Sequence, residues 1–227
     1  MASFGAAAAD AEQQTRARNL LFFSGADFST RSEFTWGGID TPLFGPRDRS
    51  GPILRIVGGT GRYNYVADGV EDGQVNGMVT AGEFLAGWRV LRQKVYGAVL
   101  LGVEAEEHLI DRIDPDNHVQ GLGVGVRIAG EVSWKPTERW RLDLSGAYGS
   151  AFDLYRARAA VGYNAFSTVL AGAEAEATQN TGSEQARLGL FVEGVRLGRL
   201  FLKASAGGVY DTDGFGGYGR VGADIYW

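Results

Sequence analysis

The sequence predicts an all-β protein, a transmembrane, antiparallel, up-and-down β-barrel of about 12 strands. Three observations predict this fold. Apolar and polar residues alternate with a period of two from about residue 20 to the last residue, as they do in strands with one apolar face. Short and longer connections alternate between these segments. Four of the five tryptophans lie at one end of the segments, on their apolar face.

The first five predicted strands alternate less regularly than the rest. Three lie near residues 20–29, 33–41 and 52–64. In the fourth, over residues 78–89, Phe84 and Trp88 share one face and Glu83 lies on the other. The fifth follows from residue 95, with valines and a leucine on one face and Glu104 and Glu106 on the other.

The alternation is cleanest in the second half of the chain. Val124, Val126 and Ile128 share one face, and Arg127 and Glu131 share the other. After a short turn the pattern restarts and then recurs to the end of the chain. The predicted strands of this half are residues 122–135, 140–148, 155–164, 168–177, 187–193, 200–206 and 220–227.

The lengths of the connections favour a membrane barrel over a soluble sandwich, which would also alternate. Short connections at residues 91–93, 136–139, 165–167 and 197–199 alternate with longer polar ones at 66–76, 109–119, 179–184 and 211–217. Bacterial barrels have short periplasmic turns, longer outer loops and an even number of strands. Residues 29–32 and 42–52 depart from the rule, as a short outer and a long inner connection.

Aromatic residues give an independent indication. Tryptophan and tyrosine favour the membrane interface, and we expect a girdle on the periplasmic side, whose members share the apolar face: Trp88, Trp134, Trp140, Tyr163 and Trp227. The alternative is that these are ordinary core aromatics at strand ends. The chain also ends on Trp227 with apolar residues at every second position before it, which resembles the insertion signal of outer-membrane proteins.

Composition excludes several other classes. A net charge of −5 argues against a nucleic-acid-binding protein, and the absence of cysteine excludes disulfides and thiolate chemistry. No apolar run approaches the roughly 18 residues of a membrane helix. We expect residues 1–18 to form a leader or disordered segment and residues 19–227 a single barrel domain; a cytoplasmic protein with a disordered tail is the alternative for that segment.

The polar face is expected to line the lumen. Its charged members are Glu83, Arg89, Glu104, Glu106, Arg127, Glu131, Arg141, Asp143, Arg156, Arg158, Glu174, Glu176, Arg187, Glu193, Lys203, Arg220 and Asp224. Neither sign dominates, whereas an ion-selective channel has a biased lining. Two interpretations remain: ion pairs that plug the lumen, or a polar path for an uncharged sugar chain, with Tyr96, Phe201 and Tyr226 as stacking surfaces.

Residues that would carry catalysis or hold a cofactor are not expected. The run from Gly121 to Gly125 lacks the third glycine of a nucleotide fingerprint and lies in a predicted strand. His108 and His118 lie in or beside an acidic segment, residues 104–118, which we interpret as a solvated loop in preference to a cation site. His108 also shares the inward face of Glu104, the wrong side for a lipid hydrolase. We therefore predict no enzyme, no cofactor and no metal.

The sequence resembles a known family over about residues 20–227. The stretches that carry the resemblance are residues 22–25 (FFSG), 54–63 (LRIVGGTGRY), 146–158 (GAYGSAFDLYRAR) and 216–219 (GGYG). They resemble the cellulose biosynthesis protein BcsS family of alphaproteobacteria. The resemblance implies a secreted outer-membrane protein linked to cellulose production, and it supplies no catalytic residues.

From the resemblance and the residues together, we predict a non-catalytic accessory or scaffold of the bacterial outer membrane; the alternative is a narrow channel for glycan or small solutes. Expected partners are outer-membrane lipid, lipopolysaccharide and the cellulose secretion machinery or the glucan itself, without nucleic acid.

Overall fold

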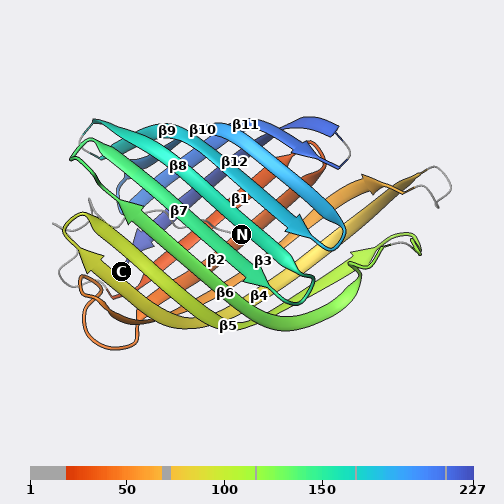
Figure 1. Cartoon of the computed structure of the whole chain (residues 1–227), viewed down its shortest axis with the longest axis horizontal. Coiled ribbons are helices and arrows are strands. Elements are labelled where there is room, and N and C mark those ends of the chain that lie inside the picture. The colour runs from red at the N-terminus through yellow and green to blue at the C-terminus, as the bar shows by residue number, and fades with distance from the viewer. Residues whose placement is uncertain (1–18, 68–72, 116, 167, 213) are drawn as a thin grey trace.

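The computed structural model describes residues 19–67, 73–115, 117–166, 168–212 and 214–227 as a closed barrel (Figure 1). Its strands are β1 (Leu21–Ser29), β2 (Ser32–Pro42), β3 (Gly51–Val66), β4 (Gln74–Arg92), β5 (Val95–Ile110), β6 (Gly121–Trp134), β7 (Trp140–Gly149), β8 (Leu154–Phe166), β9 (Val169–Asn180), β10 (Ser183–Leu197), β11 (Leu200–Asp211) and β12 (Gly214–Tyr226). Each pairs antiparallel with its neighbours in sequence, and β1 pairs with β12. The predicted up-and-down barrel of 12 strands is confirmed. The leader expected over residues 1–18 lies outside the described residues.

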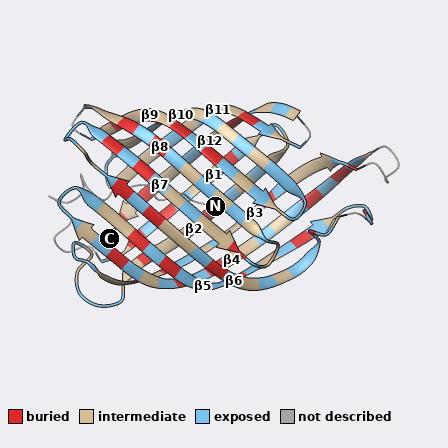
Figure 2. Ribbon diagram, in the orientation of Figure 1, coloured by how far each residue is buried: buried red, intermediate tan, exposed pale blue. Residues whose placement is uncertain are grey.

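The side chains divide between the two faces of the barrel wall as the alternation predicts. Buried and exposed residues follow one another along most strands (Figure 2). Leu190 in β10 is 70% exposed on the outer face, whereas Arg127 in β6 is 2% exposed on the inner face. A wall that is apolar outside and polar inside is the arrangement of a barrel surrounded by lipid. In the described ranges, no helix is long and apolar enough to cross a membrane.

The barrel has two unequal ends. At one, which we call the terminal end, Leu20 and Trp227 pair through backbone hydrogen bonds of 3.0 and 2.8 Å. At the other, the far end, strands β3 to β6 project beyond the rest of the wall (Figure 1). The far end therefore carries a one-sided extension.

Two predicted outer loops are wrong. β9 continues to Asn180 and β10 begins at Ser183, and β11 and β12 are separated only by residues 212–213. The polar and glycine-rich sequence there predicts loops. The backbone N–H and C=O groups nevertheless pair with the neighbouring strand, and this pairing does not depend on the side chains. The predicted acidic loop of residues 104–118 is also shorter, because its first part, to Ile110, belongs to β5. The two predicted exceptions to the loop-length rule are confirmed: residues 30–31 form a tight turn, and residues 43–50 form a long loop.

Among the described residues, the buried apolar side chains form small separate clusters and no continuous core. Leu21, Phe23, Trp36 and Tyr226 form one small apolar cluster near the terminal end, and β3, β4 and β5 contribute a second. Charged side chains occupy much of the remaining interior.

Candidate functional site: the charged interior

The structure places the predicted lumen residues on the inner side of the wall. The buried members are Glu83, Arg89, Glu104, Arg127, Glu131, Arg141, Asp143, Glu174, Glu176, Arg220 and Asp224. Partly exposed are Glu106, Arg156, Arg158, Arg187, Glu193 and Lys203. A buried charge is costly unless it is paired, so the partners of these side chains decide what the interior does.

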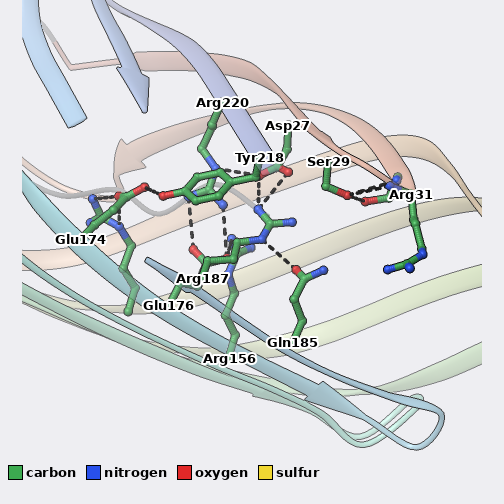
Figure 3. A network of polar contacts seen from close by, with 12 residues as sticks. Asp27, Ser29, Arg31, Arg156, Glu174, Glu176, Gln185, Arg187, Tyr218 and Arg220 are labelled. Atoms are coloured by element: carbon green, nitrogen blue, oxygen red, sulfur yellow. Dashed lines mark hydrogen bonds and ion pairs between the residues drawn. The ribbon is translucent and has the colours of Figure 1, made fainter. Parts of the chain in front are cut away.

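A first charge network lies in the half of the barrel towards the far end, as the strand bounds show. Figure 3 shows its residues from close by. Arg220 in β12 donates to Asp27 in β1 (Nε to Oδ2, 2.8 Å) and to Glu176 in β9 (Nη1 to Oε2, 3.2 Å). Arg187 in β10 donates to Asp27 at 2.7 Å, and Arg156 in β8 donates to Glu176 at 2.8 Å. Two of these pairs, Arg220–Glu176 and Arg187–Asp27, join strands that are not neighbours in the wall and so bridge the space inside it. The other two join neighbouring strands.

The network continues through Glu174 in β9. Arg158 donates to its Oε2 at 2.6 Å from Nη2, and the Tyr218 hydroxyl donates to its Oε1 at 2.9 Å. The Tyr218 hydroxyl also lies over Gly189, where any Cβ would overlap it. Glycine at this inward position thus makes room for the cross-lumen hydrogen bond.

A second charge network lies near the terminal end. Arg55 in β3 joins Asp40 in β2 (Nη2 to Oδ2, 3.0 Å) to Glu131 in β6 (Nη2 to Oε1, 2.8 Å). The loop of residues 43–50 turns inward, so that Arg47 Nη1 reaches Asp40 Oδ1 at 2.7 Å. The Tyr96 hydroxyl donates to Glu131 at 2.6 Å. The loop of residues 43–50 and strands β2, β3, β5 and β6 therefore contribute side chains to one network inside the wall.

Further ion pairs lie at the same heights along the barrel as the two networks. Arg127 lies 3.3 Å from Glu104 and 3.5 Å from Glu83, at the level of the first network. Nearer the terminal end, Lys203 lies 3.0 Å from Asp224, and Arg141 pairs with both Asp143 and Glu193. The interior thus holds two layers of charge, an upper layer around Arg220 and Arg127 and a lower layer around Arg55 and Arg141.

A small cavity lies among the charged side chains on the β9–β12 side. Its volume is about 30 Å³, and it is lined by Arg158, Glu174, Lys203 and Arg220, among others. This volume is on the scale of one water molecule.

The comparisons identify the family of this barrel. A family model described as "Cellulose biosynthesis protein BcsS" matches residues 21–226, nearly the whole chain. The chain belongs to the BcsS family. No curated protein matches it in sequence.

Solved structures share the fold of this BcsS-family barrel. The KdgM porin in complex with disordered oligogalacturonate is 10% identical, with a TM-score of 0.53 over 91% of this chain and 99% of the porin chain. LpxR from Salmonella typhimurium is 12% identical, with a TM-score of 0.54 over 92% and 100%. The translocator domain of the autotransporter NalP from Neisseria meningitidis is 11% identical, with a TM-score of 0.53 over 95% and 91%. At these identities the likeness concerns the fold alone.

The aromatics predicted to stack sugars lie in the lower layer of the BcsS-family barrel. Tyr226 is 4% exposed and meets Phe201 edge-on, with ring centroids 5.5 Å apart. The Arg47 guanidinium lies 5.8 Å from the centroid of the Tyr226 ring. The Tyr96 hydroxyl donates a hydrogen bond to Glu131. A sugar could stack on these rings only if the lower layer opened.

The predicted girdle residues lie at the terminal end with their side chains outward. Trp88, Trp134, Trp140 and Trp227 are exposed, and Tyr163 meets Trp140 edge-on at 5.2 Å. Sequence reasoning did not assign a matching set at the far end, where Tyr148 and Tyr155 lie 4.7 Å apart and Tyr210 and Phe215 are exposed. The signal was present, because these residues occupy the same apolar face at the opposite strand ends.

Sequence reasoning also missed four interior charges. Asp27, Asp40 and Arg55 lie on the inward face of the first three strands, where the alternation was too irregular for a firm assignment. Arg47 lies in a loop, and no periodicity places a loop side chain inside a barrel.

The two histidines lie in different surroundings. His108 is buried in β5; its Nε2 donates to Glu106 Oε1 at 2.6 Å, which leaves Nδ1 to accept from the Tyr63 hydroxyl at 3.0 Å. His118 is exposed. Asp111 is held by the Asn76 side-chain amide (2.8 Å) and backbone N–H (2.9 Å), which lower the pKa of its carboxyl. Among the described residues, no group of three or more His, Cys, Asp or Glu side chains could hold a metal ion. Asp116 lies outside the described residues.

Gly123, in the run from Gly121 to Gly125, lies against a neighbouring part of the chain on the inner side of the wall. The neighbour is the turn between β7 and β8: a Cβ at Gly123 would come within 2.8 Å of the Phe152 ring. The turn is fixed to the wall by the Ala151 N–H, which donates to Glu104 Oε1 at 3.0 Å. The far end of the lumen is therefore narrowed by this turn.

Proposed function

We propose that this BcsS-family barrel is a non-catalytic accessory of bacterial cellulose production that acts in the outer membrane as a closed scaffold. The observation that carries the proposal is the pairing across the interior, in which arginines such as Arg220 and Arg55 bridge strands that are not neighbours. On this proposal, the pairs leave no continuous aqueous path through the lumen. The family supplies the link to cellulose.

The outward face supports the outer membrane as the location. It is apolar between two sets of aromatics, and a closed barrel satisfies every backbone group within the wall, as hydrocarbon requires. Outer-membrane lipid and lipopolysaccharide are then the immediate partners. The cellulose secretion machinery or the glucan would be met at the two ends.

The arrangement of histidine supports a role without catalysis. A hydrolase of the serine type needs a histidine free to take a proton from the nucleophile. Both ring nitrogens of His108 are engaged, by Glu106 and Tyr63, on the inner side of the wall.

The polarity of the interior favours the second candidate function, a narrow channel for glycan or small solutes. Packed apolar residues would close a barrel without the cost of burying charge, whereas a charged lining is ready to be hydrated. In this case Tyr96, Phe201 and Tyr226 would contact the sugar, and their replacement by alanine would impair export without preventing insertion.

Planar-bilayer conductance of the purified barrel tests the scaffold against the channel. We expect no stable current steps from the wild type, and regular steps would favour the channel. Deletion of the gene from its host tests the link to cellulose. Cellulose deposition should change while glucosyl transfer in isolated membranes persists, and unchanged deposition would reject the link.

A further inference from the structure

The inner wall of the far-end extension carries an aromatic strip made of Tyr63, Tyr65 and Phe152. Tyr63 and Tyr65 follow one another on the inward face of β3, with ring centroids 6.3 Å apart and planes inclined by 21°. Phe152 reaches the same wall from the turn between β7 and β8. All three side chains are only partly buried.

His108 holds the strip together from behind. Its ring lies edge-on to Tyr63 at 5.6 Å and to Phe152 at 5.1 Å, and its Nδ1 binds the Tyr63 hydroxyl. Tyr63 also lies over Gly77 in β4, so closely that any Cβ there would overlap the ring. One face of Tyr63 therefore rests on backbone.

Polar groups border the strip. The Tyr65 hydroxyl donates to Asp114 Oδ2 at 2.8 Å and accepts from Asn117 Nδ2 at 2.7 Å. Glu106 lies at the other side, bound to His108. Aromatic faces with a few fixed polar groups beside them are the usual composition of a small-ligand site.

The strip is not needed to close the barrel. It lies above the upper charge layer, on strands that project past the rest of the wall. The Tyr63 and Tyr65 ring centroids lie 6.3 Å apart, a spacing on the scale of one sugar ring, and flat aromatic faces suit the axial C–H groups of a glucose ring. The bordering carboxylates disfavour an acidic polymer.

We propose that the aromatic strip binds an extended, neutral glucan chain at the far end of the barrel. Tyr63 and Tyr65 provide the stacking faces, Asp114 and Asn117 hold the Tyr65 hydroxyl in place, and His108 is a positioning residue for Tyr63. This inference rests on the proposed link to cellulose but not on an open lumen.

The test is calorimetric titration of the purified full-length barrel in detergent with cellohexaose. We expect binding by the wild type and a loss of at least about tenfold in affinity for Tyr63→Ala and for Tyr65→Ala. Tyr63→Phe, which keeps the ring and loses only the bond to His108, should bind nearly as well as the wild type. Oligogalacturonate should bind far more weakly than cellohexaose.

Tyr210→Ala is the matched control, because Tyr210 is also a tyrosine near a far-end strand terminus but points outward and is 65% exposed. It should leave binding unchanged, and heat-modifiable gel migration shows whether each variant is folded. The proposal is overturned if the wild type does not bind cellohexaose, or if the Tyr63 and Tyr65 variants, once folded, bind as well as it does. Binding combined with unaltered cellulose in the deletion strain would reject the proposed function and leave the strip as a glucan site.

Discussion

Arg220 is the residue that holds most of the first charge network together. It contacts both Asp27 and Glu176; without it, Asp27 is left with Arg187 and Glu176 with Arg156. Removal of one partner of a buried ion pair leaves uncompensated charge. Arg220→Ala should therefore lower the free energy of unfolding by about 3 kcal/mol, measured by urea titration in lipid vesicles.

Lys94→Ala provides the control for Arg220, because Lys94 lies in an exposed turn and makes one long contact, 3.4 Å to the Pro136 carbonyl. It should change the free energy of unfolding by less than about 0.5 kcal/mol. Neutralising the two orphaned carboxylates as well, in Asp27→Asn with Glu176→Gln, should recover part of the stability lost in Arg220→Ala. No recovery would show that Arg220 stabilises the barrel by packing and not by charge.

Leu144 and Ser145 test the two faces of the wall at adjacent residues. Leu144 lies outward, midway between Trp140 and Tyr148 on β7, and Ser145 lies inward. Leu144→Arg should reduce the free energy of folding into vesicles by about 2–4 kcal/mol, the cost of arginine at the membrane midplane. Ser145→Arg should cost less, because its neighbours across the sheet include Glu131. Equal losses, measured by urea titration, would contradict the assignment of the faces.

Residue-level prediction succeeded where a side chain's face is set by its own strand. The inward face of Arg127 and the outward face of Trp134 follow from parity alone. Which charges meet does not follow, because Arg220 and Glu176 are 44 residues apart and approach only when the sheet closes with a particular stagger. The pairing of Arg47 with Asp40 could not be predicted for another reason, because Arg47 lies in a loop and a loop has no periodicity.

At the scale of elements, β10 contains an irregularity that the alternation did not reveal. The register with β11 shifts between Glu193 and Val195, and Gly194 between them has a φ of +81°. Only glycine adopts such a conformation without strain, and a Cβ here would also overlap the carbonyl oxygen of Thr168. The bulge lets Glu193 point inward to Arg141 while the strand continues.

Gly194→Ala should therefore destabilise the barrel by about 1–3 kcal/mol, seen as a lower urea midpoint. Gly217→Ala in β12 is the matched control, because its φ is ordinary and a Cβ would approach nothing closer than 3.8 Å. It should leave the midpoint nearly unchanged. A Gly194 variant as stable as the wild type would mean that the bulge can be repaired without glycine.

Element boundaries were predictable where turns are sharp and uncertain where polar strands run past the membrane. The turn after Ser29 and the loop after Pro42 were located correctly. The ends of β9 and β5 were placed too early, because strands outside hydrocarbon have no need of an apolar face and so lose the alternation.

At the scale of the whole molecule, the scaffold proposal predicts that the two charge layers act as barriers in series. The lower layer includes the pair of Arg55 with Glu131, and the upper layer includes the pair of Arg220 with Glu176. An ion must pass both, so opening either layer alone leaves the other in place. The molecule is thus expected to stay closed unless both layers are disrupted.

Bilayer conductance of paired deletions tests this series arrangement. Arg55→Ala with Glu131→Ala, and separately Arg220→Ala with Glu176→Ala, remove both partners of a pair, which avoids most of the cost of a lone buried charge. Each double variant should remain silent, whereas the quadruple variant should give step currents, because a polar cavity then runs through both layers. Lys94→Ala with Glu138→Ala, at exposed turns, controls for the loss of charge. Currents from either double variant alone would show that its layer is the single gate, and a silent but folded quadruple variant would show that the turn at Phe152 or the loop of residues 43–50 closes the barrel without the charges.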